Sequence, residues 1–155
     1  MMRPPSDQPV PRVIAWESTR ACNLVCRHCR ASAQETPAPD ELTTEEMKRL
    51  IDQIAAFSQP IFIISGGEPL MRPDVFEIAA YATAKGLRVA MSPNGTLITP
   101  ERVEQMKATG IQRISVSLDG SCAERHDAIR GVPGAFEAAV RGMGYLSLIH
   151  ISEPT

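Results

Sequence analysis

Three cysteines lie within eight residues of one another, and they carry the clearest chemical signal in the sequence. Cys22, Cys26 and Cys29 follow the spacing C-x3-C-x2-C, which lets one short loop wrap three corners of an iron–sulfur cubane. Three cysteine ligands leave one of the four irons open to a substrate or cofactor. The alternative is a structural zinc site with His28 as its fourth ligand. His28 and Cys29 are consecutive residues, which is an awkward geometry for two ligands of one tetrahedral ion. The spacing therefore favours the cluster.

A glycine-containing loop is the second motif with chemical potential. The run Ser-Gly-Gly-Glu-Pro includes Gly66, Gly67 and Glu68 and directly follows an apolar run. Two successive glycines let backbone groups approach a ligand closely, and the Glu68 carboxylate can accept a hydrogen bond from an ammonium group. The same five residues also form ordinary turns, so this loop by itself identifies no ligand.

Small polar residues follow two further apolar runs. Asn94 lies in an SPNG segment, and Ser115, Ser117 and Asp119 alternate in an SVSLDG segment. Alternation along a strand places the last three on one side, where small hydroxyl groups leave room for a ligand. Asn94, Ser117 and Asp119 are therefore candidate site residues, with helix caps and turns as the alternative of equal weight.

The segment 126–131, with sequence HDAIRG, is open to two interpretations. Its arginine, Arg130, suits carboxylate recognition if the segment folds over a site. We predict instead that this segment is solvated surface, because charged side chains are mostly exposed.

The elements that carry these motifs alternate along the chain. Short apolar runs predict strands at 13–16, 61–64, 87–91 and 114–118. Capping, proline and glycine signals predict helices that begin near Thr43, at Pro73, at Pro100 and near Pro133 or Gly134. This order predicts an α/β protein, an incomplete (β/α) barrel of about four parallel βα units, with the sheet covered on both faces. Active sites of such barrels lie at the C-terminal ends of the strands, and all the motifs above follow strands.

Composition and charge narrow the class of protein. The 155 residues are 43% hydrophobic and 22% charged with a net charge of −2, which indicates one globular domain. Without a basic block the sequence predicts no nucleic-acid partner, and without an apolar run of about 18 residues it predicts no membrane partner. Residues 1–12 are proline-rich and lack the apolar core of a signal peptide, so we expect an extended arm on a cytoplasmic protein.

The last ten residues have an unusual sequence. Residues 146–155 read LSLIHISEPT, which resembles the in-frame translation of a common transposase sequencing adapter residue for residue. The alternative is a natural strand at 146–151 followed by a polar tail. Because a ten-residue identity favours the adapter, we exclude 146–155 from the fold prediction. We expect 13–145 to be the core of an N-terminal fragment.

Together, the three-cysteine loop after the first strand and the GGEP loop after the second resemble the radical S-adenosylmethionine (radical SAM) superfamily over residues 12–145. The resemblance implies the N-terminal part of a partial TIM barrel. It also implies two cofactors, a 4Fe–4S cluster and S-adenosylmethionine. The cluster delivers one electron, a carbon–sulfur bond of S-adenosylmethionine breaks, and a 5′-deoxyadenosyl radical abstracts hydrogen from the substrate.

The resemblance also assigns roles to residues. The three cysteines ligate the cluster, and Gly66, Gly67 and Glu68 hold the amino group of the methionine moiety. His28 occupies a position near adenine where the family often has an aromatic residue. The region of Asn94, Ser117 and Asp119 corresponds to the one that meets the ribose and the methionine carboxylate.

Longer segments, including PRVIAWESTRACNLVCRHCRASA and GLRVAMSPNGTLITPE, resemble the subgroup with a C-terminal SPASM-type extension. Within it they are most similar to heme b synthases of the siroheme-dependent pathway. This implies oxidative decarboxylation of two iron–coproporphyrin propionates, with electrons from a low-potential donor such as flavodoxin or ferredoxin. Peptide maturases and other tetrapyrrole-modifying enzymes share this N-terminal half, so the substrate is a tetrapyrrole or a peptide. A non-catalytic zinc-binding module is the alternative from another class.

Overall fold

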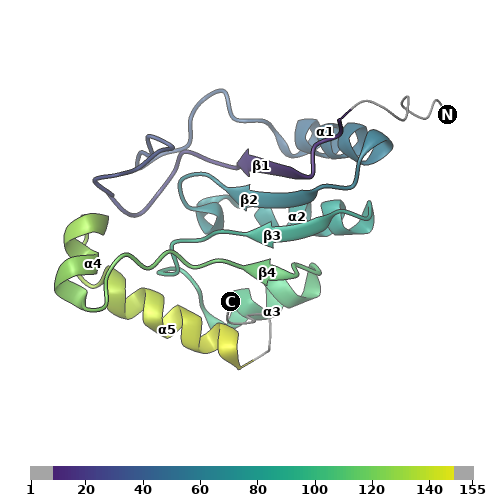
Figure 1. The fold of residues 1–155 in the computed structure, drawn as a ribbon. Helices are drawn as coiled ribbons and strands as arrows, with labels where there is room; N and C mark the ends of the chain where they lie inside the picture. Colours follow the sequence, from purple (N-terminus) through teal and green to yellow (C-terminus); the bar gives the residue numbers. More distant parts are fainter. Residues whose placement is uncertain (1–8, 149–155) are drawn as a thin grey trace.

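In the part of the chain that the structure describes, four parallel strands form one open sheet in the order β1-β2-β3-β4, so strands that follow one another in the chain also pair in space. The computed structural model describes residues 9–148. The strands are β1 (Val13–Glu17), β2 (Ile61–Ser65), β3 (Arg88–Met91) and β4 (Arg113–Ile114). β1 and β4 are the two edges, and the sheet does not close into a barrel (Figure 1). The predicted α/β class and parallel topology are confirmed.

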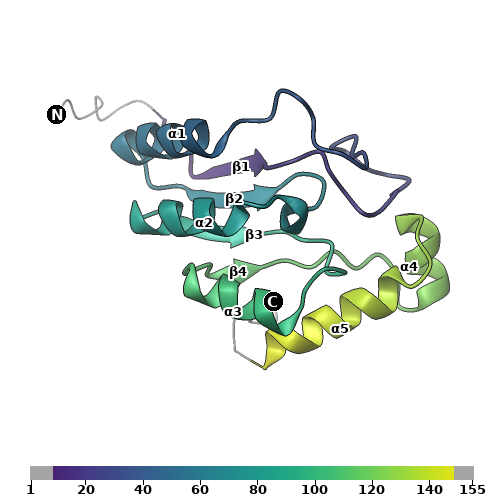
Figure 2. The same cartoon turned by 180° about the vertical axis from the view of Figure 1, so that it is seen from behind.

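Within residues 9–148, five α-helices and one short 3₁₀ helix connect and cover the strands. They are α1 (Thr44–Phe57), η1 (Pro69–Met71), α2 (Val75–Ala84), α3 (Pro100–Ala108), α4 (Ala123–Arg130) and α5 (Ala135–Ser147). Figure 2 shows α1, α2 and α3 side by side on one face of the sheet, while α4 lies beyond the C-terminal ends of the strands. The long loop between β1 and α1 extends to the same end.

Local sequence explains why α1 begins where it does. The Thr43 hydroxyl accepts from the backbone N–H of Glu46, and the Glu46 carboxylate accepts from the N–H of Thr43, which completes the predicted capping box. Met47, Ile51 and Ile54 then fall on one face of the helix and are buried. This apolar stripe fixes α1 against the sheet.

Burial along β2 shows which face of the sheet belongs to the core. Phe62 and Ile64 are fully buried beneath the helices, whereas Ile61 and Ile63 alternate to the other face and are only half-buried. The prediction that both faces are covered therefore holds for one face only, within the residues described.

The larger departures from the sequence-based predictions are in β4, α2 and α4, whereas the bounds of the other strands differ by one residue. β4 ends at Ile114 instead of at residue 118. Its partner β3 ends at Met91, which pairs with Ile114, and Ser115 N donates to Met91 O just after this last pair. α2 begins at Val75, two residues after Pro73, since Pro73 and Asp74 form a turn. The third difference is α4, a helix where solvated surface was predicted.

The end of the described chain belongs to α5. Residues 146 and 147 continue this helix, and Leu146 packs into the main core. The alternative of a strand beginning at residue 146 is wrong for the part described. Residues 149–155, with most of the adapter-like segment, and residues 1–8 of the predicted arm lie outside the described residues.

Candidate active site

The three clustered cysteines lie in the loop between β1 and α1, residues 18–42, which we call the cysteine loop. It folds back on itself, because Cys22 N donates to Gln34 O over 2.8 Å and Gln34 N donates to Arg20 O over 2.9 Å. Cys22 is buried, Cys26 is half-buried and Cys29 is exposed, and none of them is in a disulfide within the described chain. Folding back brings the three thiols to one end of the sheet.

A cavity of about 290 Å³ opens at the C-terminal ends of the strands, where the fold class places active sites. Eight of the ten predicted site residues line it: Cys22, Cys26, Cys29, His28, Gly66, Gly67, Asn94 and Ser117. The other two, Glu68 and Asp119, lie outside its wall. The structure thus joins four loops that are far apart in the sequence, one after each strand.

The two glycines of the GGEP loop are pressed against the cysteine loop. Gly67 N donates to Thr19 O over 2.7 Å, and Glu68 N donates to Ala21 O over 2.8 Å. A Cβ on Gly67 would lie 2.4 Å from Ala21 O, and one on Gly66, whose φ is +121°, would lie 2.6 Å from Thr19 O. The glycines are therefore required by close backbone packing, in addition to any role toward a ligand.

N–H groups surround the sulfur atoms of Cys22 and Cys29. Cys22 Sγ accepts from Leu24 N at 3.4 Å and from Asn94 Nδ2 at 3.9 Å, while Cys29 Sγ accepts from Ala33 N at 3.3 Å. Burial raises the pKa of the Cys22 thiol, and the hydrogen bonds act in the opposite direction. Bound iron would deprotonate these thiols outright, and the N–H groups would then stabilise the thiolates.

Arg130 brings a charged donor to the third sulfur. Its Nη1 lies 3.6 Å from Cys26 Sγ, and its Nη2 lies 2.6 Å from a carboxylate oxygen of Asp119. The same oxygen lies 3.5 Å from His28 Nε2, so Asp119 stands between a guanidinium and an imidazole. Arg130 Nε is buried without a hydrogen-bond partner in the described part of the chain.

The prediction of solvated surface for residues 126–131 is wrong. His126 is 0% exposed and Arg130 is 9% exposed, because their four-residue spacing places both on the inner face of α4. His126 Nδ1 accepts from Asp119 N at 3.2 Å, and its ring meets the edge of Phe136. The helical spacing and the C-terminal Gly131 were the signals that could have revealed this helix.

The carbonyl end of α4 also holds the cysteine loop. Val25 N donates to Arg130 O and Arg27 N donates to Ile129 O, each over 3.0 Å. These amides satisfy carbonyl groups that the last turn of a helix leaves without partners. A Cβ on Gly131, whose φ is +75°, would lie 2.3 Å from Val25 O, so glycine is needed at this contact.

The Glu68 side chain is buried and does not line the cavity. It is 0% exposed, with Oε1 accepting from Leu70 N at 3.0 Å and Oε2 accepting from Asn94 N at 2.7 Å. Burial raises the pKa of this carboxyl to about 7, and the two backbone donors counteract part of the rise. The expected contact with an ammonium group stays a prediction, since both carboxylate oxygens have other partners here.

The Asn94 side chain forms hydrogen bonds through both its oxygen and its nitrogen. Its Oδ1 accepts from both the N–H and the hydroxyl of Thr96, at 2.9 and 2.8 Å, and its Nδ2 also donates to Asn23 Oδ1 at 2.8 Å. Ser117 reaches the cavity wall, whereas Ser115 does not line it.

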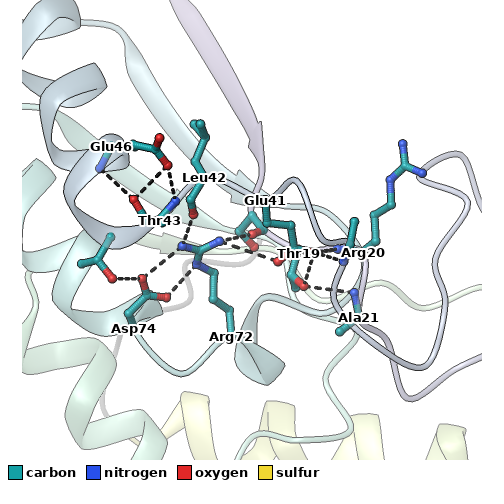
Figure 3. A network of polar contacts seen from close by, with 12 residues as sticks. Thr19, Arg20, Ala21, Glu41, Leu42, Thr43, Glu46, Arg72 and Asp74 are labelled. Carbon is teal, nitrogen blue, oxygen red and sulfur yellow. Dashed lines mark hydrogen bonds and ion pairs between the residues drawn. The ribbon is translucent and has the colours of Figure 1, made fainter.

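Arg72 fixes the two ends of the cysteine loop to the segment that follows GGEP (Figure 3). Its Nη1 donates to Ser18 O at 2.8 Å, its Nη2 donates to Leu42 O at 2.7 Å, and its Nε donates to Asp74 Oδ1 at 2.7 Å. The guanidinium lies over the ring of Trp16, 5.0 Å from its centroid. One buried cation thus joins β1, the loop and the start of α2.

Glu41 closes the base of the loop within the same network. Its Oε1 accepts from Thr19 Oγ1, Arg20 N and Ala38 N at 2.8–2.9 Å, and its Oε2 lies 3.8 Å from Arg72 Nη1 (Figure 3). Sequence reasoning missed Arg72 and Glu41, because neither lies in a recognisable motif. Their partners are up to 54 residues away.

The fold and the site together define an open parallel α/β sheet with a three-cysteine loop and a glycine loop at its C-terminal edge. Residues 16–152 match the family described as the radical SAM superfamily. The chain belongs to this superfamily.

Two relatives show which enzymes of the superfamily have similar sequences. The chain is 59% identical over 138 residues to the AdoMet-dependent heme synthase of Nitratidesulfovibrio vulgaris, covering 89% of this chain and 38% of that protein. It is 50% identical over 131 residues to the Fe-coproporphyrin III synthase of Methanosarcina barkeri, covering 84% and 33%. The chain therefore spans between a third and two fifths of these relatives' length.

Among solved structures, native anSMEcpe with bound AdoMet matches with a TM-score of 0.73 at 20% sequence identity, over 90% of this chain and 41% of that one. This likeness concerns the fold. Within the described residues, no helix is long and apolar enough to cross a membrane.

The residues present fit the cofactors that the family implies. Three free thiols with N–H donors at each sulfur are the donor set for a cluster with one open iron. A glycine wall and polar side chains on the same cavity leave room for a ligand beside it.

Proposed function

We propose that this chain forms the cofactor-binding part of an enzyme that cleaves S-adenosylmethionine reductively and starts radical chemistry on a tetrapyrrole. The observation that carries this proposal is the meeting of Cys22, Cys26 and Cys29 with the backbone of Gly66 and Gly67 on one cavity. Family membership favours the cluster over a zinc-binding module.

The chain's own residues have distinct roles in this proposal. The three cysteines hold the cluster through three of its irons, and the fourth iron stays available to S-adenosylmethionine. A cluster bound there would supply the electron that breaks the carbon–sulfur bond. Backbone groups of Gly66 and Gly67, which line the cavity, would bind the amino group of the methionine moiety.

Two side chains offer donors to the methionine carboxylate. The Ser117 hydroxyl lines the cavity, and Arg130 adds a guanidinium whose Nε lacks a partner among the described residues. Arg recognises carboxylates because its planar fork of donors matches their geometry. His28 is exposed and lines the same cavity, and it would lie beside the adenine.

For the substrate we propose iron–coproporphyrin, whose propionates would be decarboxylated oxidatively. The names of the relatives at 59% and 50% identity support a tetrapyrrole. Electrons would come from a low-potential flavodoxin or ferredoxin. Peptide maturation remains the other candidate that the sequence resemblance leaves open.

Anaerobic reconstitution tests both the proposed enzyme class and the proposed substrate. The full-length protein, given iron and sulfide and then a strong reductant, should turn brown and convert S-adenosylmethionine to 5′-deoxyadenosine. Added iron–coproporphyrin should then lose carbon dioxide, with a matching mass change. A protein that binds zinc and stays colourless would contradict the enzyme assignment, and a protein that modifies only a peptide would contradict the tetrapyrrole assignment.

A further inference from the structure

The Glu68 carboxylate accepts from two backbone N–H groups and does not line the cavity. We infer that Glu68 and Asn94 act as a pair of positioning residues that direct an N–H donor at the sulfur of Cys22, and that Glu68 does not bind the cofactor's amino group. This inference rests on the proposed function, because it concerns the cysteine that would hold the cluster.

The first step is the position of the Glu68 carboxylate. Its Oε1 accepts from Leu70 N two residues ahead, which fixes the side chain at the start of the 3₁₀ helix. Its Oε2 accepts from Asn94 N at 2.7 Å, a charge-assisted contact across the gap between the loops after β2 and β3. The side chain is fully buried and the cavity wall does not include it. A ligand in the cavity therefore meets the Gly66 and Gly67 backbone rather than this carboxylate.

The second step is the orientation of the Asn94 side chain. Glu68 holds its backbone N–H, and both donors of Thr96 hold its Oδ1. The amide is thereby assigned without ambiguity, since an oxygen must face the Thr96 donors and the NH₂ group must face Cys22. Nδ2 lies 3.9 Å from Cys22 Sγ and 2.8 Å from Asn23 Oδ1. A thiolate attracts an N–H more strongly than a thiol does.

The third step is the consequence for a bound cluster. Hydrogen bonds to cluster sulfurs withdraw electron density and make reduction easier, so they raise the reduction potential. Groups that orient the ligands of a metal centre tune it without touching the metal. Removing the Asn94 donor should therefore lower the potential, and releasing Asn94 by changing Glu68 should act in the same direction.

The test compares variants of the full-length protein reconstituted with its cluster. Asn94→Ala removes the donor, and Glu68→Gln keeps the size of the side chain but cannot accept from both backbone N–H groups. The readouts are iron content, the cluster's reduction potential from an EPR-monitored titration, and the dissociation constant for S-adenosylmethionine. Glu41→Gln is the matched control, since Glu41 also holds the cysteine loop but contacts no sulfur.

Both test variants should lower the potential, and the double variant should equal the larger single effect because the two residues act in series. The dissociation constant for S-adenosylmethionine in Glu68→Gln should stay within about threefold of wild type, well under the tenfold that corresponds to about 1.4 kcal/mol. Should Glu68→Gln fail to fold, Asn94→Ala and Asn94→Asp still report on the donor to Cys22.

Three outcomes overturn the inference. The first is a Glu68→Gln variant that binds S-adenosylmethionine at least tenfold more weakly with an unchanged potential, which would make Glu68 a cofactor ligand. The second is an equal fall in potential in Glu41→Gln, which would indicate general loosening of the loop. The third is a wild-type protein that takes up no cluster, in which case the proposed function fails and the inference with it.

Discussion

Arg130 Nη1 lies 3.6 Å from the sulfur of Cys26, although 104 residues separate the two in the chain. The contact exists because α4 crosses the C-terminal ends of the strands and its last carbonyls bind the cysteine loop. A positive charge beside a thiolate favours the ionised sulfur that binds iron. The same guanidinium pairs with Asp119, so α4 contributes both backbone and side-chain contacts to the site.

Replacing Arg130 by Gln should weaken this corner of the site. The substitution removes a charge-assisted hydrogen bond, which contributes about 1.5–3 kcal/mol, and leaves Asp119 without its closest partner. We expect a lower free energy of unfolding in urea and faster loss of iron from the reconstituted protein. Arg125→Gln, at an exposed position of the same helix, is the control and should change neither quantity. If the Arg130 variant kept the stability and iron retention of the wild type, Arg130 would have no role in the site.

Cys26→Ala should abolish the cleavage of S-adenosylmethionine. The substitution leaves two ligands for the cluster, and Cys122 lies at the start of α4, outside the cavity, so it cannot replace the lost sulfur. Cys122→Ala is the matched control and should keep iron content and cleavage near those of wild type. The measurement is 5′-deoxyadenosine formed per protein under reducing conditions. Cleavage by Cys26→Ala at the wild-type rate is incompatible with the assigned ligands.

Gly67→Ala should disturb the contact between the GGEP loop and the cysteine loop. The added Cβ would lie 2.4 Å from Ala21 O and 2.8 Å from Arg20 O, and backbone atoms cannot move aside as a flexible side chain can. Overpacking of this kind costs about 1–3 kcal/mol, so we expect lower stability and lower iron content.

Gly144→Ala provides the control for this steric argument. Gly144 lies in α5, and a Cβ there would meet no atom within 4 Å. Because Ala is favoured over Gly inside a helix by about 1 kcal/mol, this variant should be at least as stable as wild type. Both variants are compared by urea denaturation and by iron analysis. A Gly67→Ala protein as stable as Gly144→Ala would show that the two loops are not tightly packed.

Acid should weaken the anchoring of the cysteine loop. Burial raises the pKa of Glu41 and Asp74, but hydrogen bonds and the Arg72 guanidinium lower it further, so each pKa lies below its ordinary value of 4.5 or 3.8. A carboxyl whose folded-state pKa is depressed stabilises the fold above its unfolded pKa, and this contribution is lost as pH falls through the folded value.

We therefore expect the free energy of unfolding of the cluster-free protein to fall as the pH drops below about 4.5. Urea denaturation at a series of pH values measures this fall. Glu41→Gln combined with Asp74→Asn should give a flatter acid dependence and lower stability at neutral pH. Glu104→Gln, at an exposed position of α3, should leave the curve unchanged. A double variant with the wild-type acid curve would show that the Arg72 network contributes no pH-dependent stability.

Most elements of this fold could be predicted from local sequence. The Thr43 capping box, the β-branched run of β2 and the Thr99–Pro100 start of α3 are short-range signals, and each gave the correct element. α4 was missed because its helical face consists of His126 and Arg130, and polar residues at helical spacing give no hydrophobic pattern. β4 was predicted too long because its length depends on its partner, β3, and not on its own apolar residues.

The sequence by itself determined the chemistry of the site: three thiols at cluster spacing and a glycine loop, each placed after a predicted strand. Parallel strands bring such loops to one edge of a sheet, so the meeting of the motifs followed from the order of elements. Only the tertiary structure decided where individual side chains point. Glu68 accepts from the backbone of Asn94 without lining the cavity, and Arg130 reaches Cys26. These directions depend on packing between loops that are far apart in the chain, and no local pattern of residue types encodes such packing.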